Sequence, residues 1–277
     1  MMLSVEDLRF SYGDHLVLDG VSFKVNEGEV ISILGSNGAG KTTLLKSMCN
    51  IHRPQEGKIV VDGKDILSLS RNDLAKNVGF VPQTAPASRM TVFDSVLIGR
   101  RPHIELNAGE YDINIVAEVI DSLGLSHLSL RYLDEISGGE LQKVHIARAI
   151  VQEPKVFILD EPTSSLDISN QHMTMHMIED AVRSRNMCTV MTMHDINLAI
   201  HYSDRFLFLA NGKAIAYGGV DVIDEALIKE VYGIDSEIID HRGIPLVVPM
   251  NSKKYNHRSN HHHPHDIHDH LDQGMPT

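Results

Sequence analysis

The sequence predicts an α/β fold in which a parallel sheet core carries an antiparallel N-terminal β subdomain and an inserted α-helical subdomain. The core is predicted by two apolar runs, at residues 30–34 (VISIL) and 155–162 (KVFILDEP), each of which precedes a helical segment. Strands that are apolar on both faces are typical of the centre of a parallel sheet covered by helices. The insertion is predicted by helical periodicity, which replaces strand patterns from about residue 84 to residue 150.

The N-terminal segments read as strands joined by turns. Residues 3–34 alternate as a small sheet does, and Gly13-Asp14 and Glu27-Gly28 mark its turns. Residues 58–66 (KIVVDGKDI) predict a hairpin, and Ser70 is placed to cap a short helix.

The rest of the chain adds strands and helices in alternation. VGFVPQ predicts a short strand that ends at Gln83. Helices and strands then follow in the segments 91–102, 111–125, 137–151, 155–162, 168–185, 188–195 and 205–219. We expect one domain at residues 1–250, a helical subdomain at about 84–150, and a His-rich, disordered tail at 251–277.

Composition excludes several classes of protein. The chain has 37 acidic and 25 basic residues and a formal net charge of -12, which opposes binding to a nucleic-acid backbone. No apolar stretch reaches the ~18 residues of a membrane span, and the N-terminus lacks a signal-peptide core, so we expect a soluble, cytosolic chain. The two cysteines, Cys49 and Cys188, lie in apolar segments and are predicted to be buried free thiols.

The segment GSNGAGKT matches the G-x-x-x-x-G-K-[ST] phosphate loop at every fixed position, between a predicted buried strand and a helix. Its glycines let backbone N–H groups surround phosphates, Lys41 neutralises the β and γ oxygens, and the Thr42 hydroxyl is a ligand for Mg²⁺. The predicted ATP-binding residues are Gly35, Ser36, Asn37, Gly38, Ala39, Gly40, Lys41, Thr42 and Thr43.

Carboxylates at the end of the run VFILDE supply the other half of a phosphate-transfer site. Asp160 is predicted to hold the Mg²⁺ ion, while Glu161 is placed to polarise an attacking water.

A second predicted anion site lies about a hundred residues after the first. Ser137, Gly138 and Gly139 open a helix whose apolar residues recur on one face. The free N–H groups and the positive end of the helix dipole at such a start attract phosphate. One chain therefore carries two helix starts suited to phosphate.

The phosphate loop, VPQ, ISGGE, ILDEPTSSLD and a strand-end His194 occur in an order and at spacings that resemble the ATP-binding subunit of ABC transporters, up to about residue 249. The resemblance implies a homodimer of head-to-tail copies, in which Ser137, Gly138 and Gly139 of one copy face the ATP held by the other. A two-fold interface then gives two sites per dimer.

The resemblance also implies roles for single residues. Tyr12 is similar to the aromatic residue that stacks on adenine, and a core or surface tyrosine is the alternative. Gln83 is similar to the glutamine that senses Mg²⁺ and the attacking water, so it is counted as both catalytic and metal-binding. His194 matches the histidine that contacts the γ-phosphate.

Two smaller features complete the comparison. The loop residues Ser164, Ser165 and Asp167 match those that cross the dimer interface. Glu140 stands where many relatives have Gln, and we expect activity to survive because it lies in the first helical turn.

The substrate class is inferred from the same resemblance. TVFDSVLIGRRPH, HDINLAIHYSDRFLFLANG and the ending VYGIDSEIID with RGIPLVVP are similar to importers for iron–siderophore, haem or cobalamin. The implied partners are membrane permease subunits at the cytoplasmic face of the membrane and, indirectly, a substrate-binding protein. The helical insertion, with Gln83 at its entry and TVFDSVLIGRRP after it, is expected to offer a groove to a cytoplasmic permease helix. Ser95 is expected to lie within cross-linking reach of a permease loop.

Three alternatives stay open at this point. A manganese or zinc importer fits the same cassette. A soluble ABC ATPase acting on nucleic acid or ribosomes usually has two cassettes or a long coiled coil, neither of which this chain has. An inactive cassette requires loss of Lys41, Asp160, Glu161 or His194, and all four are present.

The tail HRSNHHHPHDIHDHLDQ has two interpretations. Its imidazoles and carboxylates suit Zn²⁺, Ni²⁺, Cu²⁺ or Fe²⁺. The alternative is a solubilising, disordered end with no metal function.

Overall fold

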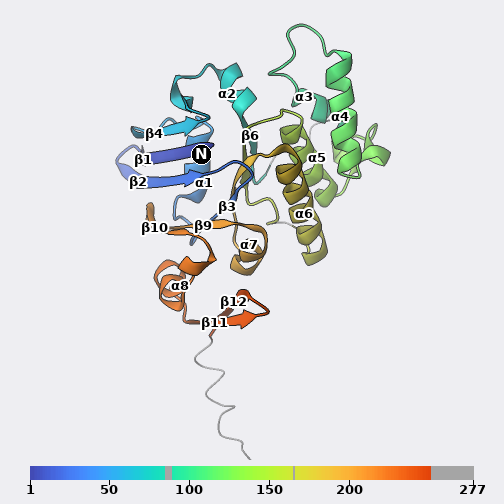
Figure 1. Ribbon diagram of the computed structural model, residues 1–277. Helices are drawn as coiled ribbons and strands as arrows, with labels where there is room; N and C mark the ends of the chain where they lie inside the picture. The colour runs from blue at the N-terminus through green and yellow to red at the C-terminus, as the bar shows by residue number, and fades with distance from the viewer. Residues whose placement is uncertain (85–88, 165, 251–277) are drawn as a thin grey trace, which may run out of the picture.

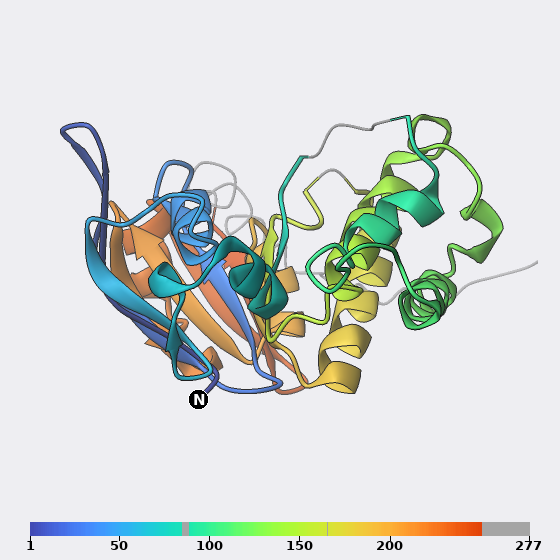
Figure 2. The same ribbon diagram turned by 90° about the horizontal axis from the view of Figure 1, so that it is seen from above.

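The computed structural model describes residues 1–84, 89–164 and 166–250. They form a four-stranded sheet, a six-stranded sheet and a set of helices beside the larger sheet (Figures 1 and 2). The predicted fold class, a P-loop NTPase parallel sheet core with an antiparallel N-terminal β subdomain and an inserted α-helical subdomain, is therefore confirmed. The predicted tail, residues 251–277, lies outside the described residues.

The four-stranded sheet is antiparallel, in the order β2-β1-β4-β5. Its strands are β1 (Leu3–Tyr12), β2 (His15–Val25), β4 (Glu56–Val61) and β5 (Lys64–Asp65). The hairpin predicted at residues 58–66 is the pair β4–β5. The Ser70 hydroxyl accepts from the Asp73 amide at 3.1 Å and caps α2 (Arg71–Asn77), as predicted.

The six-stranded sheet has the order β10-β9-β3-β8-β7-β6, and all neighbours are parallel except the edge pair β9–β10. Its strands are β3 (Val30–Leu34), β6 (Val78–Val81), β7 (Val156–Asp160), β8 (Cys188–Thr192), β9 (Arg205–Ala210) and β10 (Lys213–Gly218). Every residue of β3, β7 and β8 is buried, as both-sided apolar runs require.

The helices complete the layers. Three helices follow strands of the core directly: α1 (Lys41–Met48) after β3, α6 (Ile168–Arg185) after β7, and α7 (Ile196–Tyr202) after β8. Between β6 and β7 lie α3 (Val92–Ile98), α4 (Glu110–Ser122) and α5 (Gly138–Ile150), which are the helices of the predicted insertion. The C-terminal part contains α7, α8 (Glu225–Tyr232) and the hairpin β11 (Ser236–His241) with β12 (Ile244–Pro249).

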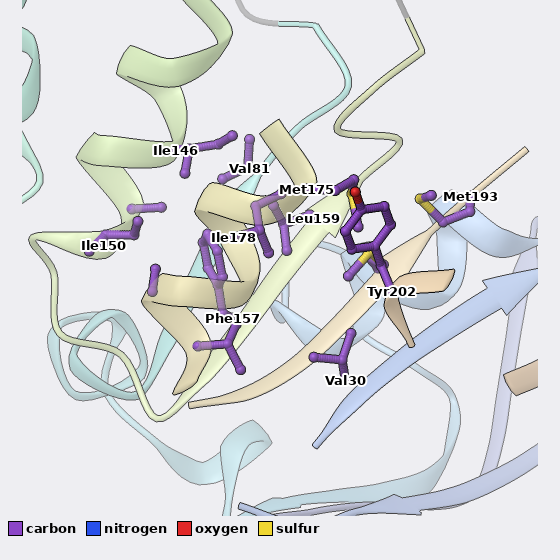
Figure 3. Packing of buried hydrophobic residues seen from close by; sticks show 14 of the residues in the cluster. Val30, Val81, Ile146, Ile150, Phe157, Leu159, Met175, Ile178, Met193 and Tyr202 are labelled. Carbon is purple, nitrogen blue, oxygen red and sulfur yellow. The ribbon is translucent and has the colours of Figure 1, made fainter. Parts of the chain in front are cut away.

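Alternate residues of the central strands enter two separate cores. Phe157 and Leu159 pack with the helical layer against Ile146, Ile150 and other residues, which Figure 3 shows from close by. Val156 and Ile158 instead join the cluster beneath the four-stranded sheet, which also contains Leu44 and Leu45 of α1. The six-stranded sheet is therefore covered on both faces, and its polar ends are left to form a site.

One predicted boundary was wrong. The strand expected to end at Gln83 ends at Val81. Pro82 follows, and because proline has no backbone N–H it cannot continue the ladder. Gln83 therefore lies beyond the sheet, in a loop.

Two expectations from composition can be compared with the described residues. Within them, no helix is long and apolar enough to cross a membrane. Cys188 is buried and Cys49 half-buried, both are free, and burial raises the pKa of each thiol.

Candidate active site

The carboxyl ends of the parallel strands β3, β7 and β8 meet at one edge of the larger sheet, next to the start of α1. A pocket of about 390 Å³ opens there. Its lining consists of Tyr12, His15, Val17, Asn37, Gly38, Ala39, Gly40, Lys41, Thr42, Thr43 and Glu161. Most predicted ATP-binding residues thus share one pocket with the predicted catalytic carboxylate, and crevices at the carboxyl ends of such sheets are the usual ligand sites of α/β folds.

The phosphate loop folds as it does because of its glycines. Gly40 is the N-cap of α1 with φ of 102°, and a Cβ atom there would lie 3.0 Å from the carbonyl oxygen of Val17. Gly35 has φ of 156°, and a Cβ atom would lie 2.2 Å from the carbonyl oxygen of Leu209. Side chains at these two positions would push the loop away from its neighbours, so the tight turn onto α1 requires glycine.

Lys41 occupies the centre of this loop. Its Nζ atom donates to the carbonyl oxygens of Gly35, at 2.7 Å, and Ser36, at 3.2 Å. Burial lowers the pKa of the Lys41 ammonium, and the charges of Glu161 and Asp160 oppose that shift. The ammonium is thus held at the pocket by backbone oxygens.

Two of the three predicted metal ligands, Thr42 and Asp160, meet directly, whereas Gln83 donates to Glu161. The Thr42 hydroxyl donates to Oδ1 of Asp160 at 3.2 Å, and Asp160 is 2% exposed. A hydroxyl and a carboxylate beside a phosphate loop are the oxygen ligands that Mg²⁺ prefers, and two such ligands leave room for water and phosphate. The residues present therefore fit a Mg²⁺ ion.

Glu161 lies between two other predicted catalytic residues. Its Oε1 atom is 2.5 Å from Nε2 of His194, and its Oε2 atom accepts a hydrogen bond from the Gln83 amide. Glu161 is 9% exposed, whereas the His194 side chain is 46% exposed. A carboxylate held from two sides at the rim of a phosphate pocket is positioned to orient and polarise a water molecule.

Tyr12 lies at the outer end of the pocket, half exposed, with its hydroxyl 2.8 Å from Nε2 of His52. Phe10 stacks on the His52 ring, with 5.2 Å between centroids. The Tyr12 ring is thus held in place while much of it faces solvent. A core tyrosine therefore does not describe this position, whereas a surface tyrosine remains the alternative to an adenine-stacking one.

The second predicted anion site is at the start of α5, where Ser137 is the N-cap. The Ser137 amide and hydroxyl both donate to Oε2 of Glu140 at 2.8 Å, and the hydroxyl accepts from the Glu140 amide at 3.3 Å. These hydrogen bonds, the backbone one first, lower the pKa of the Glu140 carboxyl. Ser137 and Gly138 are exposed, and neither lines the pocket of their own chain.

The loop between β7 and α6 is only partly described. Asp167 caps α6 by accepting from the Asn170 amide at 2.8 Å, and Ser164 is exposed. Ser165 lies outside the described residues.

Sequence reasoning missed several residues near the site. His15 and Val17 line the pocket, and His52 holds Tyr12, although none belongs to a short motif. The buried hydroxyl of Thr192 contacts both Asp160 and Glu161, and its signal was a polar residue at the end of an apolar strand. Ser95, expected to lie within reach of a permease, is fully buried, and its hydroxyl has no partner in the part of the chain that the structure describes. That expectation was wrong because Ser95 lies on the inner face of α3.

Comparison with protein families and curated proteins gives consistent matches. The sequence model described as "ABC transporter" matches residues 18–164. An uncharacterised ABC transporter ATP-binding protein of Methanocaldococcus jannaschii is 50% identical over 90% of this chain and 98% of its own length. The hemin import ATP-binding protein of Pseudomonas aeruginosa is 36% identical over 89% of this chain and 99% of its own.

Solved structures agree with these relatives. An inward-facing ABC transporter described as metal-chelate type aligns over 91% of this chain and 98% of its own, with a TM-score of 0.79 and 31% identity. A dimeric ATP-binding cassette bound to ADP and phosphate, in a post-hydrolysis state, covers 79% of this chain and 99% of its own, with a TM-score of 0.70 and 25% identity.

Proposed function

The chain belongs to the ABC transporter family and is an ATPase of that family, and from this premise we propose that it drives an importer for an iron chelate, haem or cobalamin. Two copies bind two ATP molecules head to tail. Hydrolysis, ATP and water giving ADP and phosphate, is coupled to transport by membrane permease subunits, which hold the chain at the cytoplasmic face of the membrane.

The observation that carries the ATPase mechanism is the shared pocket of the phosphate loop and Glu161. In this mechanism the loop amides and Lys41 hold the phosphates, and Glu161 accepts hydrogen bonding from the attacking water. His194 and Gln83 hold the Glu161 carboxylate. Bound between Thr42 and Asp160, Mg²⁺ would neutralise developing charge on the phosphate oxygens. Positioning and charge stabilisation supply most of the catalysis in phosphoryl transfer.

The two-copy arrangement explains the second anion site. Ser137 and Gly138 are exposed and lie outside their own chain's pocket, so they are free to contact a nucleotide held by another copy. The similar cassette that is dimeric with ADP and phosphate supports this arrangement. Each dimer then contains two composite sites related by a two-fold axis.

The substrate class rests on the named relatives. The hemin import protein of P. aeruginosa and the ferric enterobactin transport protein of Escherichia coli, 32% identical, both support iron-chelate uptake. A manganese or zinc importer is the alternative within the class. An ATPase that acts on nucleic acid or ribosomes is less favoured, because the net charge of the chain is -12.

The permease contact is proposed at a groove rather than at Ser95. A groove of about 660 Å³ lies between the end of α1, α2 and β6, and Leu74 and Phe80 contribute its apolar lining. Arg53 and Arg71 add positive charge to it. A cytoplasmic permease helix with an apolar face and acidic residues fits this chemistry. Because Phe80 precedes Gln83 by three residues, movement at the groove is transmitted to Glu161 over a short path.

The test of the mechanism is Glu161→Gln. We expect the variant to bind ATP normally, to hydrolyse it at least ~10²-fold more slowly, and to accumulate an ATP-bound dimer. Lys41→Ala should instead weaken nucleotide binding itself. Fluorescent-nucleotide titration, phosphate release and size-exclusion chromatography with ATP measure these effects. Hydrolysis at the wild-type rate by Glu161→Gln would remove Glu161 from the mechanism.

A further inference from the structure

Thr192 is the last residue of β8 and lies fully buried beside the end of β7. Its hydroxyl donates to Oδ1 of Asp160 at 2.8 Å and accepts from the backbone amide of Glu161 at 2.9 Å. We propose that Thr192 is a positioning residue, whose single hydroxyl holds the Asp160 carboxylate and the backbone of Glu161 in one geometry. The inference rests on the roles proposed above for Asp160 and Glu161.

The direction of these bonds follows from the chemistry of the groups. A carboxylate only accepts hydrogen bonds, so the one hydroxyl proton of Thr192 must be donated to Asp160. The lone pairs of the hydroxyl are then left to accept the Glu161 amide. The Thr42 hydroxyl donates to the same Oδ1 atom at 3.2 Å. Asp160 Oδ1 is therefore oriented by two hydroxyls, one from the phosphate loop and one from β8.

The backbone of Glu161 explains why its amide needs this partner. The parallel ladder between β7 and β8 ends at the pair Asp160 and Thr192, so the strands supply no further acceptor. Glu161 has φ of 50°, in the left-handed region that residues other than glycine rarely adopt. Such conformations persist where the surroundings hold them. The Thr192 hydroxyl holds the amide, and this backbone turn accompanies a side chain that reaches Gln83 and His194.

Threonine suits the task better than serine. Its β-branched side chain restricts rotation about χ1, which keeps the hydroxyl directed at both partners. A buried hydroxyl that makes short hydrogen bonds to the Asp160 carboxylate and the Glu161 amide fixes the positions of both groups in advance of the reaction.

The experiment compares Thr192→Val, Thr192→Ser and Thr189→Val in the full-length protein. Valine keeps the shape of threonine and removes only the hydroxyl. We expect Thr192→Val to lower kcat about tenfold to a hundredfold, as the loss of a supporting shell around a metal or catalytic group does. ATP affinity should stay near that of the wild type, and the Mg²⁺ concentration for half-maximal rate should rise. Thr192→Ser should restore most of kcat.

Thr189 provides the matched control. It lies on the same strand, is fully buried, and its hydroxyl has no partner among the described residues. Thr189→Val should therefore keep the wild-type kcat and Mg²⁺ dependence. Thermal unfolding of all three variants identifies any effect that is only a loss of folded protein.

Three outcomes would overturn the inference: wild-type kcat in Thr192→Val, no rescue by Thr192→Ser when that variant is folded, or an equal loss in Thr189→Val. Glu161→Gln, measured alongside, separates this inference from the proposed function. If Glu161→Gln is inactive and Thr192→Val is fully active, only the positioning role fails. If Glu161→Gln hydrolyses ATP normally, the proposed mechanism fails instead.

Discussion

Glu140 accepts two hydrogen bonds from Ser137, and it does so as a carboxylate, since these bonds lower its pKa. A carboxyl with a folded-state pKa below the unfolded value stabilises the fold above its ordinary pKa, and this contribution is lost as the pH falls through the folded value. A negative charge in the first turn of α5 also interacts favourably with the helix dipole.

Glu140→Gln should therefore reduce stability by about 0.3–1 kcal/mol at pH 7, since glutamine keeps the capping geometry but loses the charge. The difference should shrink as the pH falls below ~4.3, the ordinary glutamate value. Urea unfolding at neutral and acid pH measures it. A difference that does not depend on pH would show that packing, and not the charge of Glu140, is responsible.

Short motifs predicted the residues whose chemistry is local, and geometry was needed for the others. The phosphate loop and the pair Asp160 and Glu161 could be predicted from the sequence, because the residues that act together there are close neighbours at a fixed spacing along the chain. Thr192 could not, because its role depends on the register of β7 against β8, which brings together residues 32 positions apart. The exposure of Ser95 was expected from the resemblance alone, which does not fix the orientation of the seven-residue helix α3.

At the scale of elements, apolar runs predicted the central strands well. Because β3, β7 and β8 are buried on both faces, each appears in the sequence as a run of mostly apolar residues. The groove between α1, α2 and β6 left no such signal, since its lining combines single residues of several elements between residues 49 and 80 with Gln152. Surface shape of this kind follows from packing and not from any local pattern.

The groove can be tested by cross-linking in the assembled transporter. Arg71→Cys, which lies in the lining of the groove, should cross-link to the cytoplasmic segment of the permease. Ala226→Cys lies on α8, at the opposite end of the ribbon from α2 in Figure 1, and should not cross-link. The native Cys49 in the groove contributes little background, because burial raises its pKa and keeps it as the weakly reactive thiol.

Mass spectrometry of the cross-linked bands identifies the partner. Cross-linking through Ala226→Cys, with no cross-linked product from Arg71→Cys, would place the permease on the opposite face and contradict the proposal that the groove is its binding site.

At the scale of the whole molecule, two helix starts suited to phosphate predict complementation between damaged copies. Lys41→Ala disables the phosphate loop, and Ser137→Arg places a bulky charge on the exposed start of α5. In a mixed two-fold dimer one site carries both changes and the other carries neither.

Each variant alone should be inactive, and an equal mixture should recover up to about a quarter of the wild-type rate, since half of random dimers are mixed and one of their two sites is intact. Phosphate release from the mixture measures this recovery. Activity in protein that stays strictly monomeric with ATP would rule out shared sites.

The positive φ of Glu161 places stability and activity in opposition at one position. Glycine would fit that backbone without steric cost, so the side chain proposed to polarise the water is the one that the local conformation disfavours. Selection for stability alone would favour glycine at this position. The resulting protein would fold well and bind ATP without hydrolysing it. Replacing Glu161 by glycine should therefore separate the two properties, raising stability while removing the side chain proposed to polarise the water.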